Sequence, residues 1–184
     1  LGASTEEAQE NVAIDVAEQI RDVLLGLPAR SAVNIPGLSA EIMERLKPHL
    51  QLSETVGLLV SQLAGGHVKE MELRLQGEFA SHPSQPLVIA ALKGLLSAAL
   101  GDSINFVNAS LEAKARGIQV LEVKDESSRD FAGGSLQITT RGDQGDRCVT
   151  GAVFADGELR ITSIDEFPVN VSPSRHMLFT RHRD

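Results

Sequence analysis

The spacing of hydrophobic residues changes along this chain from a helical period to a strand period, and that change restricts the folds it can adopt. Near the N-terminus apolar residues recur every three or four positions, which is typical of an amphipathic helix. From Val68 to Phe79 they alternate with charged residues, which predicts a strand with one wet face. Strand-like segments fill the last third of the chain. We therefore predict an α+β fold with helices first and a mainly antiparallel sheet last.

Helix ends are marked by proline and glycine. The expected helices cover residues 5–26, 39–47, 53–64, 87–100 and 111–116. Pro48 separates the second helix from the third, because proline removes a backbone donor and its ring clashes with the preceding turn. Ser53 is expected to cap the third helix. Glycine follows the ends of the others, at Gly26, Gly65, Gly101 and Gly117.

Short segments of strand composition follow the helices. They cover residues 118–123, 136–140, 148–154, 159–164, 167–171 and 177–180. Turns rich in Gly, Asp and Pro separate them, and such short connections favour antiparallel hairpins. Residues 29–37 follow Pro28 and contain Pro36 and Gly37, and they predict an extended linker.

Composition excludes several classes of function. The net charge of −8 and the absence of Trp and Tyr argue against a nucleic-acid partner. The single cysteine, Cys148, cannot form an internal disulfide, and its strand position favours a buried structural thiol over a nucleophile. Because no signal peptide and no apolar run of about 18 residues is visible, we expect a cytoplasmic protein with no membrane partner.

Candidate catalytic groups are few. The sequence has no Gly-x-Gly-x-x-Gly motif, no phosphate-binding loop and no His/Cys/Asp cluster with metal-ligand spacing, so we expect no metal site. His176 and His182 alternate on an expected strand, where a charged strand edge competes with a ligand pair. Four arginines make the C-terminal stretch basic: Arg160, Arg175, Arg181 and Arg183. They would suit a phosphate or carboxylate ligand, or they are scattered surface residues.

Several motifs resemble the long form of the D-3-phosphoglycerate dehydrogenases, within the D-2-hydroxyacid dehydrogenase family. Residues 1–9, LGASTEEAQ, resemble the segment directly after that family's catalytic histidine, and residues 28–36 resemble its Ala-Val-Asn linker. Residues 106–109 and 115–118 look like its intervening, or allosteric substrate-binding, domain, a fold also known in bacterial L-serine dehydratases. Residues 177–184 look like the first strand of a serine-sensing ACT domain.

The resemblance implies a division of the chain and a few site residues. Residues 1–30 would end the substrate-binding domain, 31–172 would form the intervening domain, and 173–184 would begin the ACT domain. Leu1, Gly2 and Ala3 match a loop that approaches the nicotinamide of NAD in the intact enzyme, whereas His182 and Asp184 match an L-serine site. Arg160 matches one residue of a proposed phosphate or effector cluster. The other basic positions of that cluster hold Phe167, Pro168 and Ser172.

The intact enzyme that this resemblance implies oxidises 3-phosphoglycerate to 3-phosphohydroxypyruvate with NAD, in L-serine biosynthesis. Its catalytic histidine would precede Leu1, and both ends of the chain look like cuts inside a longer protein. We therefore expect a segment without catalytic residues or a cofactor of its own, serving regulation and homo-oligomer formation. The alternatives are a stand-alone module for small anions, such as phosphate or phosphoglycerate, and an accessory domain like that of serine dehydratases.

Overall fold

The computed structural model describes residues 5–24, 40–126, 131, 134–154 and 156–180. The chain divides into two compact units, Leu1–Leu46 and Lys47–Asp184. The first unit contains helix α1 and the beginning of helix α2. The second contains the rest of α2 and all the strands, and it carries every site considered below.

Helix α1 (Glu6–Leu24) confirms the expected N-terminal helix. Thr5 begins it, because its hydroxyl oxygen accepts a hydrogen bond from the Ala8 amide at 3.2 Å. Val12, Val16 and Ile20 are about half exposed, at 49%, 48% and 56%. The glycine expected to end the helix, Gly26, lies outside the described residues.

Helix α2 (Ala40–Ala64) corrects the expectation of two helices, because it runs through Pro48 without interruption. Its buried positions keep helical spacing beyond the proline, at His49, Leu52, Ser53, Val56 and Val60. A proline inside a helix costs about 3 kcal/mol, and burying two or three aliphatic side chains offsets this. Ser53 is not a cap. Its hydroxyl donates to the His49 carbonyl oxygen at 2.8 Å.

Within the described residues the strands form one six-stranded sheet of order β2-β1-β3-β4-β5-β6. The strands are β1 (Val68–Gln76), β2 (Gln119–Asp125), β3 (Ser135–Gly142), β4 (Arg147–Val153), β5 (Leu159–Ile164) and β6 (Phe167–Val171). All neighbouring strands are antiparallel except β1 and β2. The α+β class and the mainly antiparallel sheet are therefore confirmed.

The parallel pair β1–β2 departs from the hairpins that the sequence predicts for this region. Between the two strands lie α3 (Glu78–Ser81), α4 (Ser84–Leu100), the 3-10 helix η1 (Gly101–Ser103) and α5 (Ala109–Ala115). A helical crossover of this length returns the chain parallel to β1, whereas a short turn would reverse it. Strand β3 then pairs with the other side of β1, so β2 and β3 are not neighbours.

Three further expectations need correction. Phe79 lies in α3 and not in the first strand. Helix α4 begins at Ser84, before the expected start at Leu87, and it includes Pro86, which is tolerated because the first turn of a helix leaves its amides unpaired. Residues 177–180 are not a strand. Leu178 is 89% exposed, and none of the described strands pairs with this segment to supply backbone hydrogen bonds.

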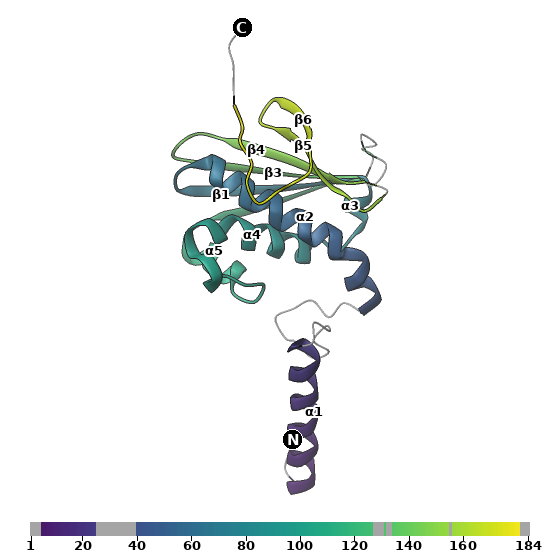
Figure 1. The fold of residues 1–184 in the computed structure, drawn as a ribbon. Helices are drawn as coiled ribbons and strands as arrows, with labels where there is room; N and C mark the ends of the chain where they lie inside the picture. Colours follow the sequence, from purple (N-terminus) through teal and green to yellow (C-terminus); the bar gives the residue numbers. More distant parts are fainter. Residues whose placement is uncertain (1–4, 25–39, 127–130, 132–133, 155, 181–184) are drawn as a thin grey trace. The chain divides into compact units, whose positions relative to one another are not determined.

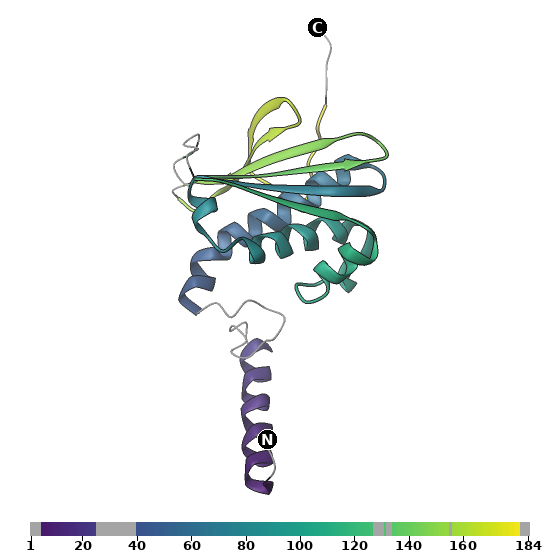
Figure 2. The same ribbon diagram turned by 180° about the vertical axis from the view of Figure 1, so that it is seen from behind.

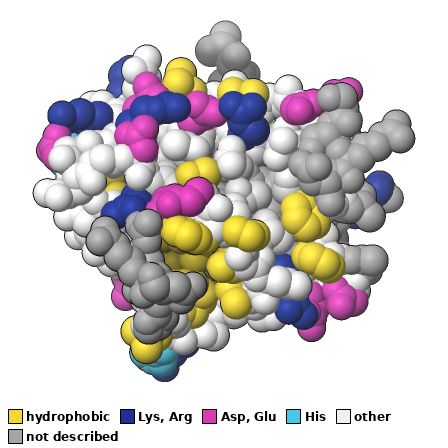
Figure 3. All heavy atoms as spheres, turned by 90° about the horizontal axis from the view of Figure 1, so that it is seen from above, with side chains coloured by type: hydrophobic (Ala, Val, Ile, Leu, Met, Phe, Trp, Pro, Cys, Tyr) yellow, Lys and Arg dark blue, Asp and Glu magenta, His cyan; other side chains and the backbone are white. Residues whose placement is uncertain are grey.

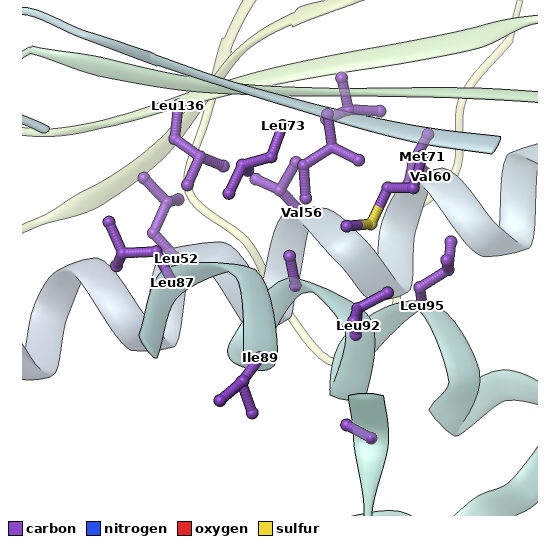
Figure 4. Close-up of a cluster of buried hydrophobic side chains, with 14 of the residues drawn as sticks. Leu52, Val56, Val60, Met71, Leu73, Leu87, Ile89, Leu92, Leu95 and Leu136 are labelled. Atoms are coloured by element: carbon purple, nitrogen blue, oxygen red, sulfur yellow. The ribbon is translucent and has the colours of Figure 1, made fainter. Parts of the chain in front are cut away.

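The core lies between one face of the sheet and two helices, α2 and α4, which run side by side beneath it (Figures 1 and 2). Figure 4 shows aliphatic side chains from both helices pointing toward Met71, Leu73 and Leu136 of the sheet. The Ser84–Ser103 segment corrects the expectation of no apolar run of about 18 residues, because by length and composition it could cross a membrane. Half of it is buried inside the domain. It is accordingly the central helix of this core.

Two glycines let α2 and α4 approach closely. A Cβ atom on Gly57 would overlap the Ala91 carbonyl oxygen, and one on Gly94 would overlap the Glu54 carbonyl oxygen. The backbones of the two helices therefore touch where they cross, and side chains at these positions would force them apart.

We predict that Gly94→Ala destabilises the domain, although the same change usually stabilises an exposed helix. The added methyl group has to displace the backbone of α2, which should lower the free energy of unfolding by about 1–3 kcal/mol. Urea denaturation followed by circular dichroism measures the change. Ala98→Ser, on the exposed side of α4, should change it by less than about 0.5 kcal/mol. Equal stability of Gly94→Ala and the unmodified chain would contradict the close crossing.

Candidate functional site

A hollow of about 680 Å³ lies between α2 and the chain that follows β6. One wall is a single face of α2, because Gln51, Glu54, Thr55 and Leu58 follow helical spacing. The opposite wall consists of Glu158, Leu159 and residues 172–175. In Figure 1 the chain after β6 runs down beside α2 before it turns toward the C-terminus.

The carboxylates around this hollow already have cationic partners. Glu54 pairs with Lys93 at 2.7 Å, and the Lys93 ammonium also lies 4.8 Å from the centre of the Phe106 ring. Glu158 pairs with Arg160 at 2.6 Å. Arg175 contributes a further guanidinium to the wall. The lining therefore suits a small polar ligand, and it holds no nucleophile beside a general base.

The hollow does not fit NAD. Lys93 and Arg160 are engaged by the carboxylates of Glu54 and Glu158, so a pyrophosphate would have to displace these carboxylates to reach them. The helical wall of the hollow is the middle of α2 and not a helix N-terminus, where backbone amides could hold a phosphate. Leu1, Gly2 and Ala3, which the resemblance assigns to the cofactor of the intact enzyme, lie outside the described residues.

Arg160 lies on β5 and is held by a carboxylate. Its Nε and Nη2 atoms donate to one Glu158 oxygen, at 3.1 and 2.6 Å. An anionic effector would have to compete with Glu158 for this guanidinium. His182 and Asp184, the expected serine ligands, lie outside the described residues, as do Arg181 and Arg183. The structure thus places Arg175 in the same wall of the hollow as Glu158, the partner of Arg160, and it describes nothing of the other four residues.

A network of charges crosses the face of the sheet that is turned away from the helices. Arg141 on β3 donates to Glu70 and to Glu72 on β1, the latter at 3.2 Å, and Arg74 donates to Glu72 at 2.9 Å. Asp146 adds a longer ion pair to Arg141 at 3.7 Å. Figure 3 shows basic and acidic side chains in contact over this face, beside a group of hydrophobic ones.

The network lowers the pKa of Glu72, whose side chain is only 15% exposed. The hydrogen bond from Arg74 lowers the pKa of this carboxyl below its ordinary value of 4.5; partial burial raises it, and Arg141 lowers it further. The alternating pattern predicts a wet strand face for Glu70, Glu72 and Arg74. It gives no sign of Arg141, because only the β1–β3 pairing brings that residue beside them.

Asp165, in the turn between β5 and β6, has a structural role. Its carboxylate accepts hydrogen bonds from Arg147 Nη1 and from the Cys148 amide, both at 3.0 Å. Asp165 adopts a positive φ of 50°, and its own amide donates to the Cys148 carbonyl oxygen.

Cys148 is half-buried, and the Thr139 hydroxyl lies 3.5 Å from its sulfur. Among the described residues, no group of three His, Cys, Asp or Glu side chains could hold a metal ion.

Comparison with known proteins identifies this arrangement. Residues 45–165 match the family model of the D-3-phosphoglycerate dehydrogenase intervening domain. The chain belongs to this family. The match confirms the resemblance, and it lies inside the range 31–172 expected for the intervening domain. The outer boundaries of that range remain predictions.

Similar proteins cover the whole chain. A D-3-phosphoglycerate dehydrogenase of Synechocystis is 62% identical over the full chain, and those of Methanocaldococcus jannaschii and Bacillus subtilis are 37% and 33% identical. The aligned region is only 33%, 34% and 35% of these relatives. The chain thus spans about a third of the length of the relatives it matches.

We predict that Glu72→Gln lowers stability near neutral pH and leaves it unchanged in acid. Because the folded state lowers the Glu72 pKa, its contribution is present above the ordinary value of 4.5 and is lost as the pH falls through the folded-state pKa. The expected loss at pH 7 is about 1 kcal/mol. Urea denaturation from pH 7 to pH 3 measures it. Glu166→Gln, at an exposed turn, is the control, and a pH-independent difference would contradict the assignment.

Proposed function

We propose that the chain is the regulatory and oligomer-building segment of a D-3-phosphoglycerate dehydrogenase. The parent enzyme oxidises 3-phosphoglycerate to 3-phosphohydroxypyruvate with NAD in L-serine biosynthesis, as a cytoplasmic homo-oligomer without nucleic-acid or membrane partners. One observation carries this proposal: the whole chain aligns with a third of proteins that bear this enzyme's name. The intervening-domain match at residues 45–165 supports it.

In this proposal the segment joins two functional parts. Residues 1–30 complete the substrate-binding domain, with Leu1, Gly2 and Ala3 close to NAD, and residues 173–184 begin the L-serine sensor with His182 and Asp184. Regulation requires that the linkers at 27–36 and 171–173 have two arrangements, so that serine in one part biases the other.

The described residues supply packing and surface charge, and we infer that the 184-residue chain does not catalyse hydride transfer. The apolar interior between α2, α4 and the sheet is filled by side chains. The hollow beside α2 presents carboxylates that are unfavourable for a dinucleotide. In this proposal the segment therefore holds the substrate-binding domain and the serine sensor in place and couples one to the other.

We predict no turnover when the 184-residue chain is incubated with NAD and 3-phosphoglycerate and NADH absorbance is recorded. The full reading frame that contains the chain should reduce NAD under the same conditions. Turnover by the isolated chain would overturn the inactive-segment proposal. A silent full reading frame, purified as a folded protein, would overturn the parent activity.

A second candidate is an anion-binding module, favoured by Arg175 in the wall of the hollow and by Arg160 beside it. Isothermal titration of the chain with 3-phosphoglycerate, 3-phosphohydroxypyruvate and inorganic phosphate distinguishes the two. Saturable heat that disappears in Arg160→Ala or Arg175→Ala, but persists in Arg116→Ala at the C-terminal end of α5, would favour the module. We expect no saturable heat with any of them, because Glu158 occupies Arg160.

A further inference from the structure

Strand β2 lies at one margin of the sheet and pairs there only with β1, among the strands that the structure describes. In Figure 2 it leads away from α5 along that margin. An edge strand presents alternate backbone N–H and C=O groups that lack strand partners, and these can pair with another strand. The seven residues of β2 are long enough for such pairing.

The two margins of the sheet differ in how they resist further pairing. At the far margin, β6 contains Pro168, which has no N–H to donate, and its register with β5 is broken by an irregularity. Both features protect an edge. Strand β2 contains no proline, and its register with β1 is continuous from Gln119 to Asp125. Val120 and Leu121 remain 36% and 37% exposed along it.

We propose that β2 pairs antiparallel with β2 of a second copy of this chain, about a two-fold axis through Val123. The pairing would join two sheets edge to edge. This proposal names the interface and the strand register of the homo-oligomer proposed above, and it rests on that proposed function.

Charge complementarity selects this register. With the axis through Val123, Glu122 lies opposite the partner's Lys124, and the symmetry repeats this pair. An axis through Glu122 would instead oppose two Glu122 carboxylates, and an axis through Lys124 would oppose two ammonium groups. An axis through Leu121 would form no pair of opposite charge within the strand. The axis through Val123 also sets Leu121 opposite the partner's Asp125, so the two Glu122–Lys124 pairs are what favour it. Glu122 and Lys124 are both exposed, so they are available for the pairing.

Lys124 can meet a carboxylate without losing its internal contact. Its ammonium donates to the His82 carbonyl oxygen at 3.1 Å. Since an ammonium has three N–H donors, two remain for the partner's Glu122. The internal bond also holds the stem of Lys124 in place, which reduces the entropy lost on association.

Charge reversal tests the register on the 184-residue chain. Sedimentation velocity over a concentration series, detected by peptide absorbance because the chain has no Trp or Tyr, gives the dimer dissociation constant. Glu122→Lys alone or Lys124→Glu alone should weaken dimerisation about tenfold or more, because each change turns two attractive pairs into repulsive ones. The double variant should restore it. A mixture of the two single variants should form heterodimers, in which both pairs are again opposite in charge.

The control is Glu166→Lys, which makes the same charge change in the turn before β6 and should leave the dissociation constant unchanged. A chain that stays monomeric over the whole series overturns the proposal, and so does a dimer that is insensitive to the single reversals. Thermal melts of each variant separate a lost contact from a lost fold. Refusal of the folded double variant to dimerise would count against the register.

Cross-linking provides a measurement that does not depend on charge. On a Cys148→Ser background, Val123→Cys would lie opposite itself at about 4.5–5.5 Å between Cα atoms, within the range of a disulfide. Mild oxidation should link this variant into a covalent dimer, whereas Val120→Cys, displaced from the axis, should link at least about tenfold more slowly. Equal linking of both variants would overturn the axis through Val123. A dimer through another surface would leave the proposed oligomer role intact, and the enzyme assay tests the catalytic proposal separately.

Discussion

The close crossing of α2 and α4 is the contact on which the rest of the domain depends. At Gly57 and Gly94 the backbone of each helix touches the backbone of the other, so the two helices pack as a single layer. That layer covers one face of the sheet and buries an interior made almost wholly of aliphatic side chains (Figure 4). Because the buried interior lacks Trp and Tyr, its stability comes from area and tight packing, with few specific polar contacts.

Much of this fold could be predicted from periodicity. The alternation of Met71, Leu73 and Leu75 with charged residues located β1, and the glycines at 65, 101 and 117 located the ends of α2, α4 and α5. Two features could not be predicted in this way. Pro48 is a local signal for a break, but burial along α2 outweighs it. The parallel pairing of β2 depends on where the crossover helices return the chain, which local composition does not encode.

The candidate site divides in the same manner. Arginine chemistry marked Arg160 from the sequence, and the structure places it beside a hollow but already paired with Glu158. The polar face of α2 at Gln51, Glu54 and Thr55 follows helical spacing, but the sequence predicts a break around Gln51, so this face becomes clear only in the continuous helix. Only its packing against residues 172–175 makes it one wall of a hollow. Contacts between distant segments thus decide which polar residues share a site. The match at residues 45–165 shows that these contacts belong to an intervening domain.

The central place of β1 has a consequence for how the domain acquires its structure. Both neighbours of β1 come later in the chain, and its pairing with β3 joins residues that are at least 59 positions apart, the separation of Gln76 and Ser135. During synthesis β1 has no strand partner until α4 and α5 have been made and β2 and β3 follow. Strand pairing over such separations is slow, and an unpaired hydrophobic strand invites aggregation. The crossing of α2 and α4 needs no strand, so these helices can associate early. Their apolar layer would then cover the hydrophobic face of β1 before β3 is available to pair with it.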